Sequence, residues 1–356
     1  GFNYTISGDD ASAFRVSGSS LQLAVGTAAD YETQTSYLIT IKSTDSGGLS
    51  TSEDFTISVV DAIEGRVVDA PLSGSNVFID LNGSLIRDSD EPNGISDEGG
   101  FFVVENKITE GSPKIISIGG TDTKTGKVLP NLALMSDLPS DTSKSMAVTP
   151  ITTVVAAAET PEAKAKVLEA LGVSGTVEEL LTTDNWAAAE AGDESAKEIQ
   201  RKNQQIGLIL QTAETLVEGD SATKATDITR VVAAQIVAVT SVNESIDLTE
   251  TATITQVLTD SIAEVAPEVT VAAETIAAVS NSVASVNALV GDSTLDPTGD
   301  ASKEIIEATQ TTLQMSIEEL TSGIADVTAF EAATASKTLF EGSTVLEALP
   351  DLDGDG

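Results

Sequence analysis

The sequence predicts a multidomain β + α protein, with N-terminal antiparallel β-sandwich modules followed by an all-α helical bundle. Two observations support this prediction. Up to about residue 143, short apolar runs alternate with polar residues and are separated by Gly, Pro, Asn and Asp. From residue 144 the chain is rich in Ala, Thr, Glu and Val, and its apolar residues recur at helical spacing. The predicted domains are residues 1–62, 63–143, 144–350 and 351–356.

The first predicted module is a partial β-sandwich over residues 1–62. Three of its stretches have the period-2 alternation of a half-buried strand: "FRVSGSSLQLAV", "SYLITIKSTD" and "EDFTISVVD". A complete sandwich of this kind has about 100 residues. We therefore expect strands to be missing from the front of this module.

The second predicted module, residues 63–143, is a small sandwich. Its strands are predicted from four apolar runs: "EGRVVD", "SNVFIDLNG", "GGFFVVEN" and "KIISIGG". The stretch "LPNLALMSDLPSDTSKS" contains Pro and Ser and predicts a connection to the helical domain.

The helical domain contains several amphipathic segments. In "TPEAKAKVLEALG", Thr160 is the expected N-cap, Pro161 the first helical residue and Gly172 the C-terminal stop. Residues 195–217 and 301–324 each place apolar side chains on one helical stripe. The stripe residues are Ile199, Ile206, Leu210, Ala213 and Val217, and Ile305, Leu313, Ile317, Leu320 and Ile324.

Two further segments complete the helical prediction. Residues 229–242 fit a buried strand by propensity alone, but their length and Ala content favour a helix. Pro267 interrupts the helical segment 249–290, and residues 291–300 predict a loop.

The composition excludes several classes of function. The 356-residue chain has 56 acidic and 18 basic side chains and a net charge of −38, which disfavours binding to nucleic acid or anionic membranes and favours cations. It contains neither Cys nor His, so thiol nucleophiles, imidazole bases, structural zinc sites and disulfides are excluded. No apolar run reaches 18 residues, so no membrane span is expected. We expect no enzymatic activity.

Residues 80–91, "DLNGSLIRDSDE", match the ligand positions of a calcium loop. That template uses loop positions 1, 3, 5, 7, 9 and 12, with a backbone carbonyl at 7 and Glu at 12. The corresponding residues are Asp80, Asn82, Ser84, Ile86 through its carbonyl, Asp88 and Glu91. The template has Gly at position 6, where this chain has Leu85. The alternative interpretation is an acidic surface turn after a strand.

The last six residues, "DLDGDG", repeat the first half of the same template. Asp351, Asp353 and Asp355 occupy positions 1, 3 and 5, and Gly356 occupies position 6. The pattern predicts the start of a second calcium motif. Ca²⁺ is the expected cofactor of both loops.

Residues 29–61 resemble the C-terminal half of a cadherin-like repeat. The matching elements are Asp30-Tyr31-Glu32, a strand ending at Asp45, a Gly-rich turn, and a closing strand ending at Asp61. The resemblance implies that Glu32 and Asp45 are calcium ligands at a domain junction. A generic sandwich with surface acids is the alternative.

Residues 64–103 resemble the B-type and carboxypeptidase-regulatory-like calcium-binding sandwiches of bacterial surface proteins. The shared pattern is a Gly-x-Val-x-Asp strand, a Pro-containing turn, a Val-x-x-Asp strand, a calcium loop and an Asp-x-x-Gly-x-Phe strand. Residues 119–158 are similar to the segment after such domains in very large marine bacterial adhesins, where "VTPITT" opens a helical region.

These patterns predict a non-enzymatic, calcium-stabilised extracellular protein of the cell surface, acting in adhesion or structural display. The expected partners are calcium, neighbouring copies of the chain, and cell-surface or glycan ligands. One alternative is a filament or surface-layer subunit completed by strand donation between copies. The other is a glycan-active enzyme, which requires two carboxylates and an aromatic floor in one cleft.

Overall fold

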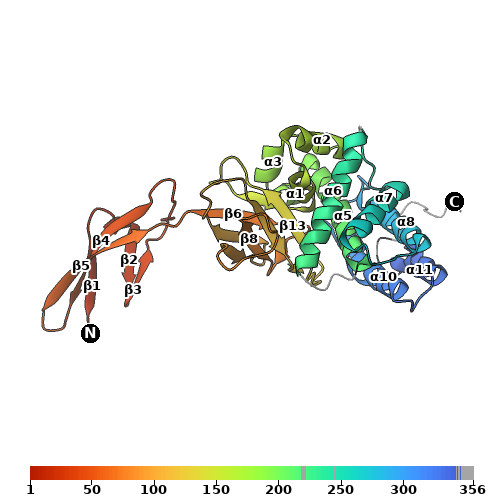
Figure 1. The fold of residues 1–356 in the computed structure, drawn as a ribbon. Helices are drawn as coiled ribbons and strands as arrows, with labels where there is room; N and C mark the ends of the chain where they lie inside the picture. The colour runs from red at the N-terminus through yellow and green to blue at the C-terminus, as the bar shows by residue number, and fades with distance from the viewer. Residues whose placement is uncertain (218–221, 244, 342, 344, 346–356) are drawn as a thin grey trace. The chain divides into compact units, whose positions relative to one another are not determined.

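The chain has a mixed β + α fold, with antiparallel sheets in its N-terminal half and helices after them (Figure 1). The computed structural model describes residues 1–217, 222–243, 245–341, 343 and 345. These residues belong to two compact units, Gly1–Ile63 and Glu64–Gly356. The second unit contains both the strands that come after residue 63 and the helices.

The first unit consists of a three-stranded antiparallel sheet and a hairpin. The sheet order is β1 (Asn3–Ser7), β4 (Ser36–Thr44) and β5 (Ser50–Ser58), and the hairpin pairs β2 (Phe14–Ser17) with β3 (Ser20–Leu23). Its core is small. Tyr37 and Ile39 of β4 are buried, and the ring of Phe14 meets that of Tyr37 edge-on at 5.3 Å between centroids.

The second unit begins with three small sheets. Their strand orders are β10-β6-β14, β13-β11-β8-β9 and β12-β7. The strands are β6 (Ala62–Val67), β7 (Leu72–Ser73), β8 (Asn76–Asp80), β9 (Asn93–Ile95), β10 (Phe101–Glu105), β11 (Lys114–Ile118), β12 (Thr121–Asp122), β13 (Ala133–Asp137) and β14 (Met146–Val148). The pairing of β14 with β6 is parallel, an exception to the expected antiparallel order.

Strand β13 lies inside the stretch that the sequence predicts as a connection, so that prediction is wrong for these residues. It pairs antiparallel with β11, from Ala133 opposite Ile118 to Asp137 opposite Lys114. All its residues except Asp137 are buried. A strand buried on both faces has no apolar–polar alternation, and the flanking Pro and Ser residues conceal its short apolar run.

A short 3-10 helix lies at Ala11–Ala13, and the α-helices begin after residue 149. They are α1 (Pro150–Ala157), α2 (Pro161–Leu171), α3 (Val177–Thr182), α4 (Asn185–Glu190), α5 (Glu194–Leu216), α6 (Ala222–Val242), α7 (Thr251–Val265), α8 (Ala273–Val290), α9 (Asp300–Ala308), α10 (Gln314–Thr321), α11 (Val327–Thr334) and α12 (Ser336–Leu339), with a π-helical turn at Thr309–Leu313. Within the described residues, none of these helices has the length and apolarity needed to cross a membrane.

Helix α1 is attached to the β layer through threonine side chains. Thr149 caps the helix by accepting the N–H of Thr152 at 3.1 Å, and Pro150 occupies its first turn. The hydroxyls of Thr152 and Thr153 donate to the carbonyl of Met135 in β13, at 2.9 and 3.2 Å. Helix α1 therefore packs directly on β13. Helix α6 also packs on this strand (Figure 1).

Most of the predicted helical features are confirmed. Thr160 caps α2, Gly172 ends it at φ 72°, and α6 covers the segment for which helix was favoured over strand. Pro267 lies between α7 and α8 as expected. Ile324, assigned to a buried stripe, is instead 78% exposed, because α10 ends at Thr321.

Candidate functional site

The predicted calcium loop connects β8 to β9 in the second unit. Its first and last predicted ligands, Asp80 and Glu91, are 2% and 4% exposed, whereas the side chains of Asn82, Ser84 and Asp88 are exposed. The loop is thus anchored at both ends in the protein, and its middle faces solvent.

Asp80 organises the first half of the loop. Its two carboxylate oxygens accept the backbone N–H groups of Ser84 at 3.0 Å and Leu85 at 3.1 Å. The N–H of Ser84 is also within 2.9 Å of Asn82 Oδ1. These bonds wrap the backbone around the carboxylate, so that three of the predicted ligand residues lie along one turn.

Glu91 closes the loop from its other end. Its Oε1 accepts the N–H of Leu81 at 2.7 Å, and its Oε2 accepts the N–H of Asp88 at 3.0 Å. Asn82 Nδ2 donates to Asp88 Oδ2 at 2.7 Å across the loop. One carboxylate therefore holds the second and ninth residues of the loop together.

Leu85 adopts the turn conformation that the template assigns to Gly. Its φ is +61°, and it is the sole non-glycine residue with positive φ in the described part of the chain. This left-handed conformation is unfavourable for a residue with a branched side chain. The Leu85 side chain packs against a buried cluster that contains Phe78 and Ile116, which gives a physical reason for an apolar residue here.

The donor set of the loop fits a hard cation, because it consists of carboxylate, amide, hydroxyl and carbonyl oxygens. The carboxylates of Asp80 and Glu91 are engaged with backbone N–H groups. No three acidic side chains in the described residues come together closely enough to hold a metal ion. The loop also presents non-acidic oxygens, at Asn82, Ser84 and Ile86, so a cation in this loop would need these oxygens as well as carboxylates.

The other predicted ligands lie elsewhere. In the first unit, the N–H of Glu32 donates to Asp30 Oδ1 at 3.1 Å, and Asp45 Oδ1 accepts the N–H groups of Gly47 and Leu49 at 2.8 and 2.9 Å. Asp45 thus stabilises the turn between β4 and β5. Asp351, Asp353 and Asp355 lie outside the described residues.

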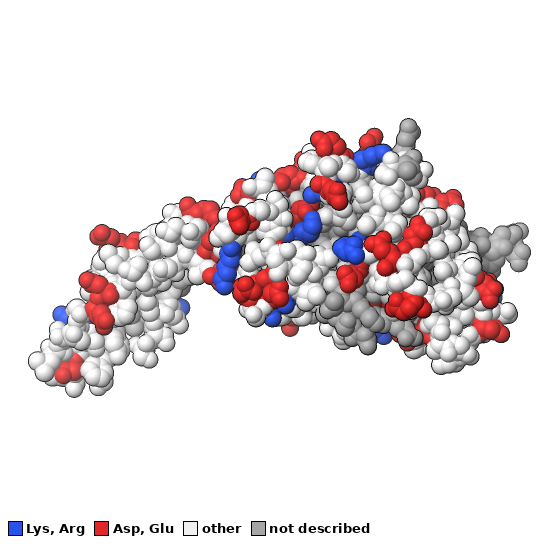
Figure 2. Space-filling view, in the orientation of Figure 1, with Lys and Arg blue, Asp and Glu red and all other residues white. Residues whose placement is uncertain are grey.

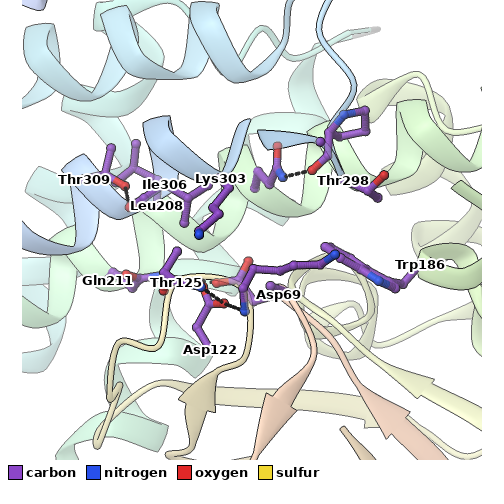
Figure 3. A pocket seen from close by; sticks show the side chains of 15 residues that line it. Asp69, Asp122, Thr125, Trp186, Leu208, Gln211, Thr298, Lys303, Ile306 and Thr309 are labelled. Atoms are coloured by element: carbon purple, nitrogen blue, oxygen red, sulfur yellow. Dashed lines mark hydrogen bonds between the residues drawn. The ribbon is translucent and has the colours of Figure 1, made fainter. Parts of the chain in front are cut away.

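A second group of functional interest was not predicted from the sequence. Asp69 and Asp122 are buried, at 8% and 1% exposure, and line one pocket between the β layer and the helices of the second unit (Figure 3). Asp122 Oδ1 accepts the N–H groups of Lys124 and Thr125 at 2.8 and 3.1 Å, and its Oδ2 accepts Gln310 Nε2 at 2.9 Å. The carboxylate of Asp69 accepts a hydrogen bond from Gln211 Nε2 at 3.1 Å.

Burial dominates the electrostatics of this pair. Desolvation, followed by the negative charge of Asp122, raises the pKa of Asp69 to about 8, against the opposing effect of the hydrogen bond from Gln211. No salt bridge to either carboxylate is formed by the Lys and Arg side chains of the described residues. The pair is therefore a buried acidic site, and the groups of the described residues that donate hydrogen bonds to it are neutral.

One local signal could have located the pair. Gly207 lies in the middle of α5, where Gly is intrinsically unfavourable. A Cβ at this position would overlap the carboxylate of Asp69. The hydrogen-bond partners Gln211 and Gln310 are 142 and 188 residues away from Asp69 and Asp122 in the sequence, so no spacing rule connects them.

No protein-family model, curated protein or solved structure matches this chain.

Proposed function

We propose that this chain belongs to a calcium-stabilised extracellular surface protein, in which β-sandwich modules and a helical bundle serve adhesion or structural display without enzymatic activity. The observation that carries the proposal is the loop at residues 80–91. Its template ligands are in register, its end carboxylates are buried, and Leu85 has the left-handed backbone of the template's Gly.

The composition supports an environment rich in divalent cations. Figure 2 shows Asp and Glu side chains spread over the visible face, with few Lys and Arg among them. A net charge of −38 destabilises the folded state through self-repulsion, and bound or screening cations relieve it. Extracellular calcium modules bind at about 10⁻⁴–10⁻³ M. With no Cys in the chain, calcium takes the stabilising role that disulfides have in many secreted proteins.

The mechanism is thermodynamic linkage. The oxygens of Asp80, Asn82, Ser84, Asp88 and Glu91, with the carbonyl of Ile86, hold the ion only when the loop is folded. Calcium therefore stabilises the folded state by an amount that increases with its concentration. A stiffened β module transmits force or fixes spacing at a cell surface, which is the use that we assign to it.

The test is thermal melting with calcium and with a chelator. We expect calcium to raise the melting temperature of the wild type and Asp80→Ala to reduce that rise. Asp97→Ala is the matched control, because Asp97 Oδ1 accepts the N–H groups of Gly99 and Phe101 in a turn outside the loop. It lowers the melting temperature equally in both conditions. A wild type that does not respond to calcium overturns the proposal.

A filament or surface-layer subunit is the second candidate, and strand β5 favours it. β5 is an edge strand of nine residues in which Ile57 alone is partly buried. Such an edge presents unpaired backbone groups that a strand from another copy can satisfy. Light scattering across a concentration series with calcium tests this: growth into polymers supports strand donation, and a monomer at the highest concentration excludes it.

A further inference from the structure

The pocket around Asp69 and Asp122 has the charge pattern of a ligand site. Its walls come from both layers of the second unit: the loop after β6 carries Asp69, strand β12 carries Asp122, α5 contributes Leu208, and α9 contributes Lys303 and Ile306 (Figure 3). Trp186, the only Trp of the chain, forms one side. Apolar walls with a few converging polar groups are typical of small-molecule sites.

The acids of this pocket lack a cationic partner within the described chain. Asp69 and Asp122 receive hydrogen bonds from neutral amide and backbone donors. Burying two neighbouring carboxylates without a counter-charge is unfavourable unless a proton or a cation joins them. A cationic ligand group removes this cost.

Gln204 is an independent indication of a ligand that donates hydrogen bonds. It lines the same pocket and is 6% exposed. Its Nε2 donates to the carbonyl of Pro297 at 2.7 Å, which fixes the amide so that Oε1 is a free acceptor. Within the described residues that buried Oε1 has no hydrogen-bond partner. A buried acceptor left unpaired is costly, and a bound N–H group satisfies it.

The two lysines of the pocket differ in their contacts with other side chains. Lys124 is paired with Glu190 at 3.1 Å, and its ammonium lies 5.2 Å from the centroid of the Trp186 ring. Lys303 is exposed and forms no ion pair among the described residues. In Figure 3 its side chain extends from α9 into the pocket, on the side opposite Asp69 and Asp122. The pocket thus combines a buried pair of acidic side chains with a positive charge at its mouth.

We propose that this pocket binds a small zwitterion of the amino-acid class, with its ammonium group against Asp69 and Gln204 and its carboxylate toward Lys303. The cavity of about 30 Å³ has room for a small head group. It accepts an ammonium head group. The remainder of the ligand lies at the mouth.

The test compares glycine with its two half-molecules, methylammonium and acetate. Each is titrated into the purified chain with a calcium chelator present, at constant pH and ionic strength. Trp186 fluorescence and calorimetry are the readouts. We expect saturable binding of glycine. Methylammonium and acetate should each bind at least roughly tenfold more weakly, because each half-molecule leaves part of the pocket's charged groups unpaired. Because calcium is absent, the result is independent of the function proposed for the loop.

Three variants assign the contacts. Asp69→Asn weakens the binding of both glycine and methylammonium. Lys303→Gln weakens the binding of glycine and leaves the binding of methylammonium unchanged. Asp9→Asn removes one charge from an exposed position of the first unit and changes neither. If Asp69→Asn does not fold, Lys303→Gln still tests the proposal, because a substitution at an exposed position leaves the fold intact. The proposal is overturned if the wild type shows no saturable glycine binding, or if that binding survives the Lys303 substitution undiminished.

Discussion

The carboxylate of Asp80 holds Leu85 in a left-handed backbone conformation: Asp80 Oδ2 accepts the N–H of Leu85 at 3.1 Å, and the φ of Leu85 is +61°. This relationship explains how the loop makes its sharp turn without Gly at the sixth position. The cost of the backbone conformation is offset by hydrogen bonding to Asp80 and by packing of the Leu85 side chain against Phe78 and its neighbours.

The first prediction concerns the order of two substitutions at this position. Leu85→Ala removes the packing and keeps the unfavourable φ, so we expect it to lower the free energy of unfolding by roughly 1–2 kcal/mol. Leu85→Gly removes more atoms but frees the backbone, so it is less destabilising than Leu85→Ala by about 1 kcal/mol. Urea denaturation with chelator measures both. A glycine variant less stable than the alanine variant contradicts the argument.

The second prediction concerns Glu91. Glu91→Gln replaces a buried carboxylate that accepts the N–H groups of Leu81 and Asp88 by an amide that accepts with one oxygen. We expect a loss of about 1–3 kcal/mol in stability without calcium, together with a weaker calcium response. Glu98→Gln, at an exposed position nearby in sequence, is the control and has little effect. Equal behaviour of the two variants would show that Glu91 does not close the loop.

The third prediction is a pH dependence of stability from Asp69. Its pKa is about 8 in the folded state and about 3.9 in the unfolded state. Between these values the folded state holds a proton that the unfolded state lacks. The free energy of unfolding therefore falls as pH rises from about 4 to about 8, by up to roughly 1.4 kcal/mol per pH unit, and is level above that range.

Asp69→Asn removes this contribution, so the variant loses less stability than the wild type between about pH 5 and pH 8. The charged groups lining the same pocket are Asp122, Lys124 and Lys303.

Glu214 on α5, whose pKa burial raises to about 7, adds a pH dependence of stability of the same sign. The Glu214→Gln variant separates the two contributions. Denaturation at several pH values is the measurement, and parallel curves for wild type and Asp69→Asn refute the assignment.

The fourth prediction is that Gly207→Ala destabilises the protein. An exposed Gly→Ala change within a helix ordinarily stabilises by about 1 kcal/mol. At Gly207 the new Cβ overlaps the carboxylate of Asp69, so the sign reverses. A double-mutant cycle with Asp69→Ala checks the cause, because removing the carboxylate relieves the overlap. A stabilised Gly207→Ala variant contradicts the close approach.

The fifth prediction compares two helix caps. Thr149 is buried and its hydroxyl accepts the N–H of Thr152 where α1 meets β13, whereas the hydroxyl of Thr160 caps α2 from an exposed position. We expect Thr149→Ala to cost about 2 kcal/mol and Thr160→Ala about 1 kcal/mol. Chemical denaturation gives both values. A larger loss at Thr160 contradicts the role assigned to the α1–β13 contact.

The sequence by itself determined the local features of this protein. An alternating run specified β4, short apolar runs specified β8 and β11, and capping residues specified α2, because these signals depend on a few neighbouring residues. The ligand spacing at residues 80–91 is local in the same way, and its calcium-binding role remains a prediction.

The tertiary structure decided what depends on contacts between distant residues. It showed that β13 is a buried strand, because its pairing with β11 and its packing under α1 and α6 outweigh the Pro and Ser around it. It also brought Asp69 and Asp122 together with donors from α5 and the π-helical turn. No spacing in the sequence specifies this pair of buried carboxylates, because their desolvation arises only when the helices cover the β layer.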